Sequence, residues 1–172
     1  MTGEINSLAF RWLPATLLAA LAAGQVSLAQ APEGIVHWAV SVNSANTVRQ
    51  GNAAALGLSG EVSEGWHVYA LAQLSGGPTP LRVTLDDNPI ARLAGSPSGT
   101  PPEEKHDASF DLDTRFYRHS FALHVPIAVK RRAELGAQLI PVDVRFQSCS
   151  ERECLPPKTI RLSVPITVLP GT

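Results

Sequence analysis

Apolar side chains recur at every second position through a series of short segments in this chain of 172 residues. A period of two puts one face of a β-strand on a core and the other face in water. Seven such strands with turn residues between them predict an all-β fold, namely an antiparallel β-sandwich. The alternating segments are residues 36–42, 56–62, 66–69, 81–85, 121–125, 140–146 and 160–168.

Glycine and proline are frequent enough for a fold with many turns, with 13 glycines and 14 prolines. Pro126, Pro141 and Pro165 interrupt strand patterns, so we expect them on edge strands or at bulges. The segment 95–107 is rich in serine, proline, glycine and charge, which indicates a long exposed loop. The one helix-like patch, residues 130–137, is short, and nothing indicates a repeat or a second domain.

The charge balance excludes one class of function. The chain has 14 basic and 15 acidic residues, a net charge of −1, so it lacks the bulk positive charge with which proteins bind nucleic acid. Apolar residues make up 44% of the chain, which is enough to bury a core. Three histidines, His67, His119 and His124, fall at strand positions without metal-ligand spacing. We therefore expect solvated histidines and no metal site.

Residues 1–29 have the layout of a secretory signal peptide. Arg11 precedes the apolar run 12–23, and small residues then occupy the −3 and −1 positions of a cleavage site. The run is shorter than the roughly 20 apolar residues that cross a bilayer. We predict a mature domain of residues 30–172 in the periplasm or outside the cell, where disulfides persist.

The two cysteines, Cys149 and Cys154, are separated by four residues at the junction of the last two strong strand patterns. A disulfide between them would clip a loop or the end of a hairpin. If the disulfide is only a structural staple, closing a loop of about six residues stabilises the folded state by only roughly 2 kcal/mol. As a redox pair, the two sulfurs would exchange a disulfide with a partner protein. Arg152 would favour the thiolate, whereas Glu151 and Glu153 would oppose it. Both interpretations stay open at this point, whereas metal binding lacks further ligands.

The sequence around the cysteines resembles the N-terminal periplasmic domain of the thiol:disulfide interchange protein DsbD. Family members often carry Tyr-Gln-x-Cys, a short spacer, and then Cys followed by a Pro-Pro pair; here Phe146 replaces the tyrosine. The resemblance covers roughly residues 35–168. The matching segments are Gln147-Ser148-Cys149, Cys154-Leu155-Pro156-Pro157, Gly65-Trp66-His67-Val68-Tyr69, Gly76-Gly77-Pro78-Thr79-Pro80, Phe116-Tyr117-Arg118 and Val125-Pro126-Ile127.

The resemblance implies an immunoglobulin-like sandwich and a role in electron transfer. In the family this domain takes electrons from the membrane-embedded part of DsbD and passes them to disulfide isomerases and thioredoxin-like proteins. By analogy, Cys154 forms the mixed disulfide with the partner and Cys149 resolves it. The two cysteines carry the electrons, so the resemblance implies no cofactor. The sequence ends at Thr172, without the membrane part of DsbD, so we expect either that the membrane relay is a separate protein or that this protein does something else on the same scaffold.

The resemblance also indicates which side chains surround the pair. Phe110 is the candidate for a phenylalanine that caps the cysteines in the family, and Tyr69 matches a tyrosine near the pair. His67 takes a position that is tyrosine in some members, so a polar contact at this wall of the site is expected to differ. The competing interpretation is a non-catalytic protein-binding sandwich, in which the disulfide only braces a loop.

Overall fold

The computed structural model describes residues 34–42 and 46–171, so the predicted signal peptide lies outside the described residues. Within this part the chain forms thirteen strands and no helix, and therefore no helix that could cross a membrane. The strands are β1 (Val36–Ser41), β2 (Thr47–Arg49), β3 (Ala53–Val62), β4 (Trp66–Tyr69), β5 (Arg82–Thr84), β6 (Ala91–Leu93), β7 (Ser98–Gly99), β8 (Glu103–Asp107), β9 (Leu112–Tyr117), β10 (Ser120–Val129), β11 (Gly136–Phe146), β12 (Ser148–Ser150) and β13 (Lys158–Leu169).

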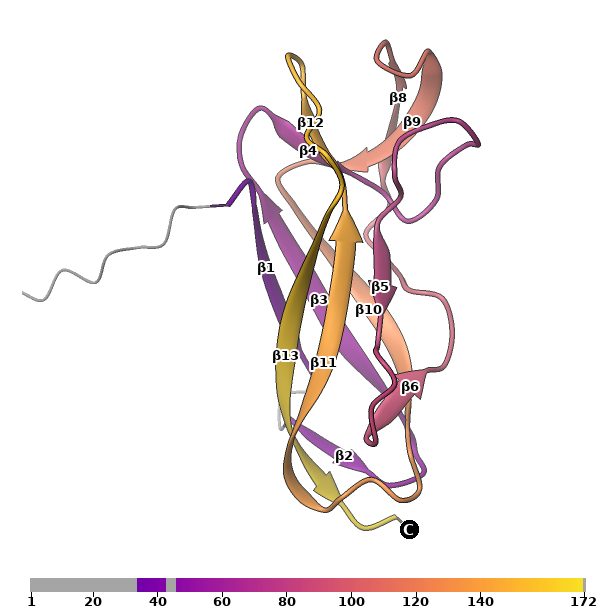
Figure 1. The fold of residues 1–172 in the computed structure, drawn as a ribbon, viewed down its shortest axis with the longest axis vertical. Helices are drawn as coiled ribbons and strands as arrows, with labels where there is room; N and C mark the ends of the chain where they lie inside the picture. The colour runs from indigo at the N-terminus through magenta and orange to yellow at the C-terminus, as the bar shows by residue number, and fades with distance from the viewer. Residues whose placement is uncertain (1–33, 43–45, 172) are drawn as a thin grey trace, which may run out of the picture. The chain divides into compact units, whose positions relative to one another are not determined.

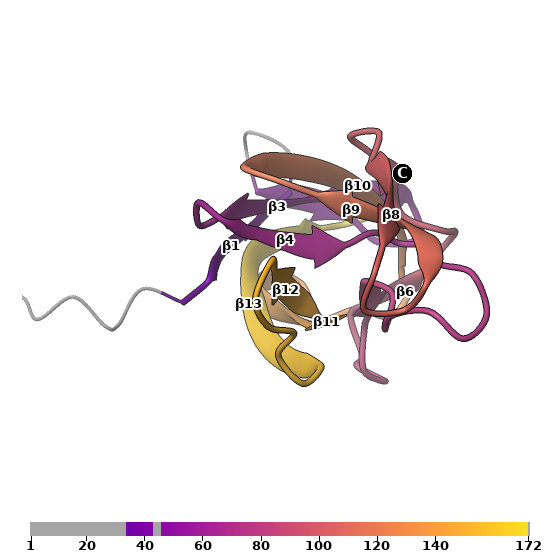
Figure 2. The ribbon, with the colours of Figure 1, turned by 90° about the horizontal axis from the view of Figure 1, so that it is seen from above.

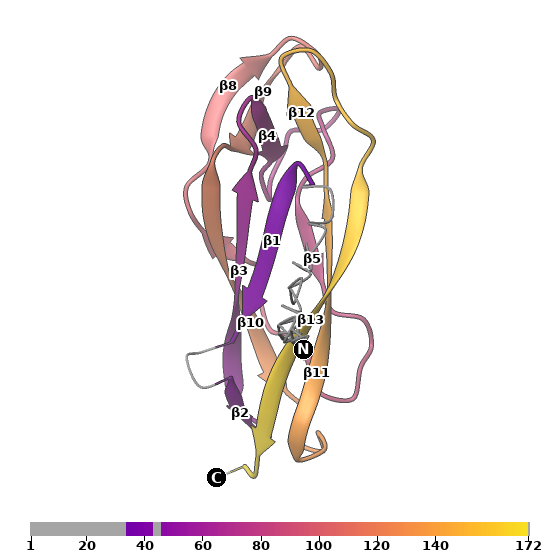
Figure 3. The same cartoon turned by 90° about the vertical axis from the view of Figure 1, so that its left-hand side faces the viewer.

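The strands form three sheets. One has the order β1-β3-β10-β6, with β7 also paired to β10, and a second has the order β2-β13-β11-β5. These two sheets face each other as the layers of a sandwich (Figures 1 and 2). The third sheet, β12-β4-β9-β8, lies at one end of the sandwich (Figure 3). All pairs are antiparallel except β13 with β2. The predicted all-β sandwich is therefore confirmed.

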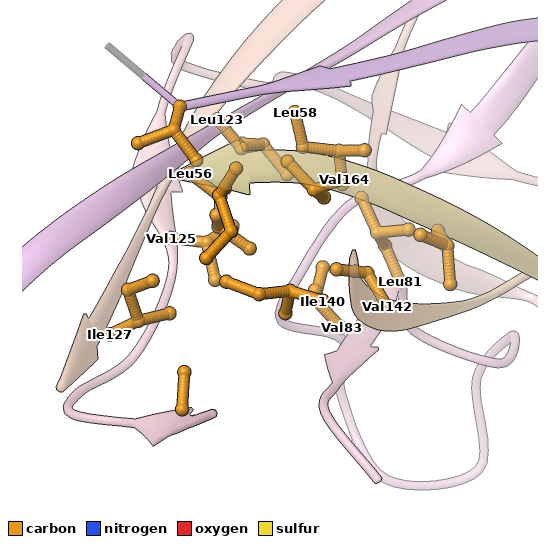
Figure 4. Packing of buried hydrophobic residues seen from close by; sticks show 14 of the residues in the cluster. Leu56, Leu58, Leu81, Val83, Leu123, Val125, Ile127, Ile140, Val142 and Val164 are labelled. Carbon is orange, nitrogen blue, oxygen red and sulfur yellow. The ribbon is translucent and has the colours of Figure 1, made fainter. Parts of the chain in front are cut away.

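The core lies between the two large sheets and consists of the side chains that the alternation predicted to point inward. Figure 4 shows these apolar side chains meeting between the layers. Burying apolar surface of this kind is the main force that holds the layers together. The ten side chains labelled in Figure 4 are each at most 4% exposed: Leu56, Leu58, Leu81, Val83, Leu123, Val125, Ile127, Ile140, Val142 and Val164.

A glycine makes room for aromatic packing at the end of the core near the third sheet. Gly60 in β3 is paired with Phe121 in β10. A Cβ atom on Gly60 would lie 2.6 Å from the Phe121 ring, so the ring occupies the space that any other residue would fill. Trp38 packs edge-on against Phe121, with ring centroids 5.5 Å apart. Trp38 therefore packs against the main core.

The three prolines lie in strands that are interior to their sheets, which corrects the prediction of edge strands. Each nevertheless occupies a position where its strand is paired on one side only. Pro126 falls between the β10 positions that pair with β6 and with β7. Pro141 precedes the part of β11 that pairs with β5, and Pro165 precedes the part of β13 that pairs with β2. Proline has no backbone N–H to donate, and this is tolerated at these positions because no strand is paired on the second side.

The segment 95–107 is not the long loop that its composition indicates. It contains β7 and β8, and β8 pairs with β9 over five consecutive residues from Glu103 to Asp107. Its side chains are mostly exposed on both faces, so the strand shows no apolar alternation. A charged pair across the strands, Arg115 Nε to Glu104 Oε2 at 2.8 Å, spans the hairpin instead. Residues 130–135 form a turn that leads into β11.

Candidate functional site

Cys149 and Cys154 form a disulfide that joins the two arms of a narrow hairpin between β11 and β13. Their Cα atoms are 4.1 Å apart, and the two residues form an antiparallel bridge. Main-chain hydrogen bonds close the hairpin on both sides of the disulfide. The Ser150 amide donates to the Glu153 carbonyl at 2.8 Å, and the Leu155 amide donates to the Ser148 carbonyl at 2.9 Å. The hairpin end predicted from the cysteine spacing is therefore present.

The two cysteines differ in exposure. Cys149 belongs to β12, which pairs with β4, and it is only 1% exposed. Cys154 lies on the outer arm of the hairpin and is exposed. Reaction with a partner protein needs one sulfur that an attacking or leaving thiol can reach, and Cys154 meets that requirement.

A small aromatic cluster encloses Cys149, apart from the main core. Tyr69 is fully buried and Phe116 is 4% exposed, and both pack with Cys149. Phe110, which is partly buried, packs against this cluster from the β8–β9 hairpin. The rings of Phe110 and Tyr69 meet edge to face with centroids 5.9 Å apart. The structure thus brings Phe110 and Tyr69 to the cysteine pair.

Local turn chemistry sets the position of Phe110. Asp107 and Leu112 are the last paired residues of the β8–β9 hairpin, and Phe110 lies in the turn between them. The Ser109 amide donates to Asp107 Oδ1 at 2.9 Å, and the Phe110 amide donates to the Asp107 carbonyl at 3.2 Å. Asp111 then takes a positive φ of 53°, which aspartate tolerates better than most residues. Asp107 therefore organises the turn that carries Phe110.

Asp107 also contacts the site directly. The Tyr69 hydroxyl donates a hydrogen bond to Asp107 Oδ2 at 2.6 Å and lies 3.9 Å from the Cys154 sulfur. Burial, and then the hydrogen bond to Asp107, raise the pKa of Tyr69 well above its ordinary value. Burial alone would raise the pKa of Asp107, but the hydrogen bonds from Tyr69 and Ser109 outweigh it and hold that pKa below its usual range. At neutral pH the tyrosine is protonated and the aspartate is ionised.

His67 is half-buried, which corrects the expectation of a solvated side chain. Its ring packs against Phe116 at 4.9 Å and Tyr69 at 5.1 Å between centroids. The Nε2 atom is buried without a hydrogen-bond partner. Burial, followed by the nearby positive charge of Arg118, lowers the pKa of His67, so the imidazole is neutral at pH 7. His119 lies in a turn with φ of 56°, and His124 is exposed in β10.

A hollow of about 690 Å³ lies beside the buried cysteine and is open to solvent. Its lining mixes aromatic rings with charges of both signs, so it suits a polar protein surface rather than an apolar small molecule. The lining includes Trp66, His67, Tyr69, Lys105, Asp107, Phe116, Arg118, Cys149, Arg152 and Glu153. The described residues contain no group of three or more His, Cys, Asp or Glu side chains that could hold a metal ion.

Two residues of this site were not predicted from the sequence. Asp107 lies in the segment assigned to a loop, although its spacing to Ser109 is typical of an Asx turn and could have indicated a hairpin there. Phe116 was noted only as part of a strand. Its burial beside Cys149 depends on the pairing of β4 with β9, which no local pattern reveals.

Comparison with known proteins identifies the family. The family described as "Thiol:disulfide interchange protein DsbD, N-terminal" matches residues 38–165. This match covers most of the chain and includes both cysteines, so the chain belongs to this family of thiol–disulfide interchange domains. The resemblance inferred from the motifs is confirmed. A comparison with curated proteins returns no match.

Two solved structures are similar to this chain at low sequence identity. The N-terminal periplasmic domain of ScsB from Proteus mirabilis aligns with 15% identity and a TM-score of 0.45, over 77% of this chain and 45% of that chain. BcpA, the major pilin subunit of Bacillus cereus, aligns with 12% identity and a TM-score of 0.35, over 78% of this chain and 40% of that chain. The present chain thus spans less than half the length of either structure.

Proposed function

We propose that this protein is a thiol–disulfide exchange module whose Cys149–Cys154 pair passes electrons between thiol proteins. The observation that supports this most strongly is the unequal exposure of the two cysteines. A short hairpin presents Cys154 to solvent and keeps Cys149 in an aromatic cluster. A disulfide that merely stabilised the sandwich would more naturally join distant strands, because a loop this short adds only about 2 kcal/mol.

The exchange begins with Cys154. In the reduced protein, the Cys154 thiolate attacks a disulfide of the acceptor protein, one acceptor sulfur leaves as a thiolate, and a mixed disulfide forms. Cys149 then attacks Cys154, which releases the acceptor as a dithiol and restores the disulfide seen in the structure. Two electrons pass to the acceptor. A reduced donor protein returns them by the reverse sequence. The protein needs no cofactor, because the sulfurs themselves change oxidation state.

Phe110 acts as a cap over the pair, while Tyr69 and His67 form the wall of the site. Phe110 projects from a turn, packs on the cluster around Cys149, and is only partly buried. A side chain held by one short turn can move aside without disturbing the sandwich. Such a movement would open the buried side of the disulfide, at Cys149, whereas Cys154 is exposed already.

The partners are proteins of the thioredoxin-like or disulfide-isomerase classes, with a membrane electron relay as the electron source. The compartment is the periplasm or the cell exterior, reached with a signal peptide at residues 1–29. Membership of a family of periplasmic interchange domains supports this location. The mixed charges around the hollow favour transient contact with a polar surface.

A redox titration with a trapping experiment tests the proposal. The reduction potential of the pair should lie near those of thioredoxin-like proteins, about −120 to −270 mV. Cys149→Ala should accumulate a mixed disulfide with a thioredoxin-like protein, whereas Cys154→Ala should trap nothing. A potential below about −300 mV, or the absence of trapping by Cys149→Ala, would show that the disulfide is a structural staple.

A further inference from the structure

His67 lies directly opposite Cys149. The two residues are paired across the neighbouring strands β4 and β12. Side chains of directly opposed residues in an antiparallel pair share one face of the sheet, with Cβ atoms about 5 Å apart. Both side chains also line the same hollow and contact the same rings, those of Tyr69 and Phe116. The imidazole is therefore a close neighbour of the buried cysteine.

The imidazole has a free nitrogen at this place. His67 Nε2 is buried and has no hydrogen-bond partner. Buried polar atoms are nearly always paired, so an unpaired one calls for an explanation. When the disulfide is closed, the Cys149 sulfur carries no proton and cannot donate a hydrogen bond to this nitrogen. In the reduced protein the same sulfur is a thiol, which can donate its proton to the nitrogen.

We propose that His67 is the general base that removes the proton from the Cys149 thiol when this cysteine resolves the mixed disulfide. The inference rests on the proposed exchange function. As the proton moves from Cys149 Sγ to the imidazole, the Cys149 sulfur attacks Cys154 Sγ. The bond between Cys154 and the partner sulfur breaks, and the partner leaves as a thiolate. The imidazolium then returns its proton to that thiolate or to water, so that charge and electrons balance.

The resolving step needs such a base more than the first step does. A thiol in apolar surroundings gives up its proton less readily than one in water, and Cys149 is almost fully buried. Cys154 is exposed, so water can take its proton. A base beside the buried sulfur therefore helps the step in which that sulfur becomes the nucleophile.

The other polar groups near the pair are poorly suited to this task. The Tyr69 hydroxyl already donates its proton to Asp107, and its raised pKa keeps it protonated. Asp107 accepts hydrogen bonds from Tyr69 and Ser109, and its lowered pKa makes it a weak base. A neutral imidazole with an unpaired nitrogen can accept a proton at pH 7.

The charged groups around His67 are mixed in sign. Arg118, which follows β9, and Lys105 in β8 favour the neutral imidazole; Asp107 and Glu103 in β8 favour the protonated form. Burial has the largest influence and lowers the pKa of His67 below its ordinary value of 6.5. The base is therefore active at pH 7 and is lost only in acid, as the pH falls through this lowered pKa. Resolution should slow in the same acidic range.

Stoichiometric reaction of the reduced protein with the aromatic disulfide DTNB isolates this step. Attack by Cys154 releases one coloured thiolate, and resolution by Cys149 releases the second, so stopped-flow absorbance shows two phases. His67→Gln removes the base, and His67→Tyr keeps an aromatic ring that cannot accept a proton at pH 7. Both should slow the second phase at least about tenfold at pH 7 and leave the first phase unchanged. Without the base, the second phase should recover only in alkali, above the pH of about 8.5 at which an ordinary thiol ionises, because Cys149 is buried.

Controls separate this inference from the proposed function. His124→Gln changes an exposed histidine in β10 and should leave both phases unchanged. Cys149→Ala should show only the first phase, and loss of that phase would overturn the exchange function itself. If the first phase persists while the second keeps its rate and pH profile in both His67 variants, His67 is not the base. Circular dichroism and melting temperature verify that each variant is folded.

Discussion

The Tyr69 hydroxyl donates a 2.6 Å hydrogen bond to the Asp107 carboxylate, across 38 residues of sequence. Tyr69 belongs to β4, which also supports the cysteine hairpin, and Asp107 ends β8, whose turn carries Phe110. The bond therefore ties the turn that carries Phe110 to the strand beneath the disulfide. Because the hydroxyl also lies 3.9 Å from the Cys154 sulfur, it links the position of Phe110 to the disulfide.

Tyr69→Phe should destabilise the protein by about 1.5–3 kcal/mol at pH 7, because a hydrogen bond to an ionised carboxylate is lost while the ring remains. The pKa of Asp107 is lowered in the folded state, so its contribution to stability is present above the pKa of the unfolded chain and is lost as the pH falls through the folded value. The difference between variant and wild type should shrink below about pH 4. Urea unfolding at pH 7 and pH 3 measures this.

The control for this variant is Tyr117→Phe. The Tyr117 ring stacks on Phe121 in the main core, with centroids 4.3 Å apart. Its effect on stability should be the same at pH 7 and at pH 3. A Tyr69→Phe effect that is equally independent of pH would contradict a role for the Asp107 carboxylate.

Phe110→Ala should make the disulfide react faster with dithiothreitol, because the ring that packs over the cluster around Cys149 is removed. The free energy of unfolding should fall by less than the roughly 3–5 kcal/mol that is typical of replacing a fully buried phenylalanine with alanine, because Phe110 is only partly buried. Leu139→Ala, a change at a side chain that is 59% exposed, should leave the reduction rate unchanged. Equal reduction rates for Phe110→Ala and wild type would exclude the cap.

Gly60→Ala should destabilise the sandwich by about 1–3 kcal/mol, because the new methyl group would meet the Phe121 ring at 2.6 Å. Gly57→Ala in the same strand meets its nearest neighbour at 3.6 Å and should cost clearly less. Adding Phe121→Leu to Gly60→Ala should restore part of the loss that the crowding causes. Chemical denaturation of the three variants measures the free energy of unfolding and so checks the register of β3 and β10. Equal losses for Gly60→Ala and Gly57→Ala would argue against the pairing of Gly60 with Phe121.

Removal of the disulfide by Cys149→Ala with Cys154→Ala should lower the free energy of unfolding by about 2 kcal/mol and leave the sandwich folded. The large sheets are held by a core that does not include the cysteines. A redox pair must be opened in every cycle, so the fold has to survive without the bond. Far-UV circular dichroism and urea unfolding measure both effects, and loss of the β-sheet signal would favour a structural role.

The sequence predicted the sandwich well, because each layer has one face on the core and one in water. The same rule failed in the third sheet. Val68 in β4 packs into the main core, while its neighbour Tyr69 packs into the cluster around Cys149. Both faces of this strand are covered, so His67 is half-buried rather than solvated. Strand β8 was not predicted because the opposite holds there: neither face is covered. Its mostly exposed side chains show no alternation of apolar and polar residues.

The sequence by itself determined the fold class, the family motifs and the hairpin that brings Cys149 and Cys154 together, because these depend on local alternation and on short spacing along the chain. The tertiary structure decided how the two cysteines differ. Pairing of β12 with β4, and of β4 with β9, buries Cys149 beside Phe116 and His67 and leaves Cys154 exposed. Those contacts join segments that are distant in sequence, so only the packed sheets reveal the environment of each sulfur.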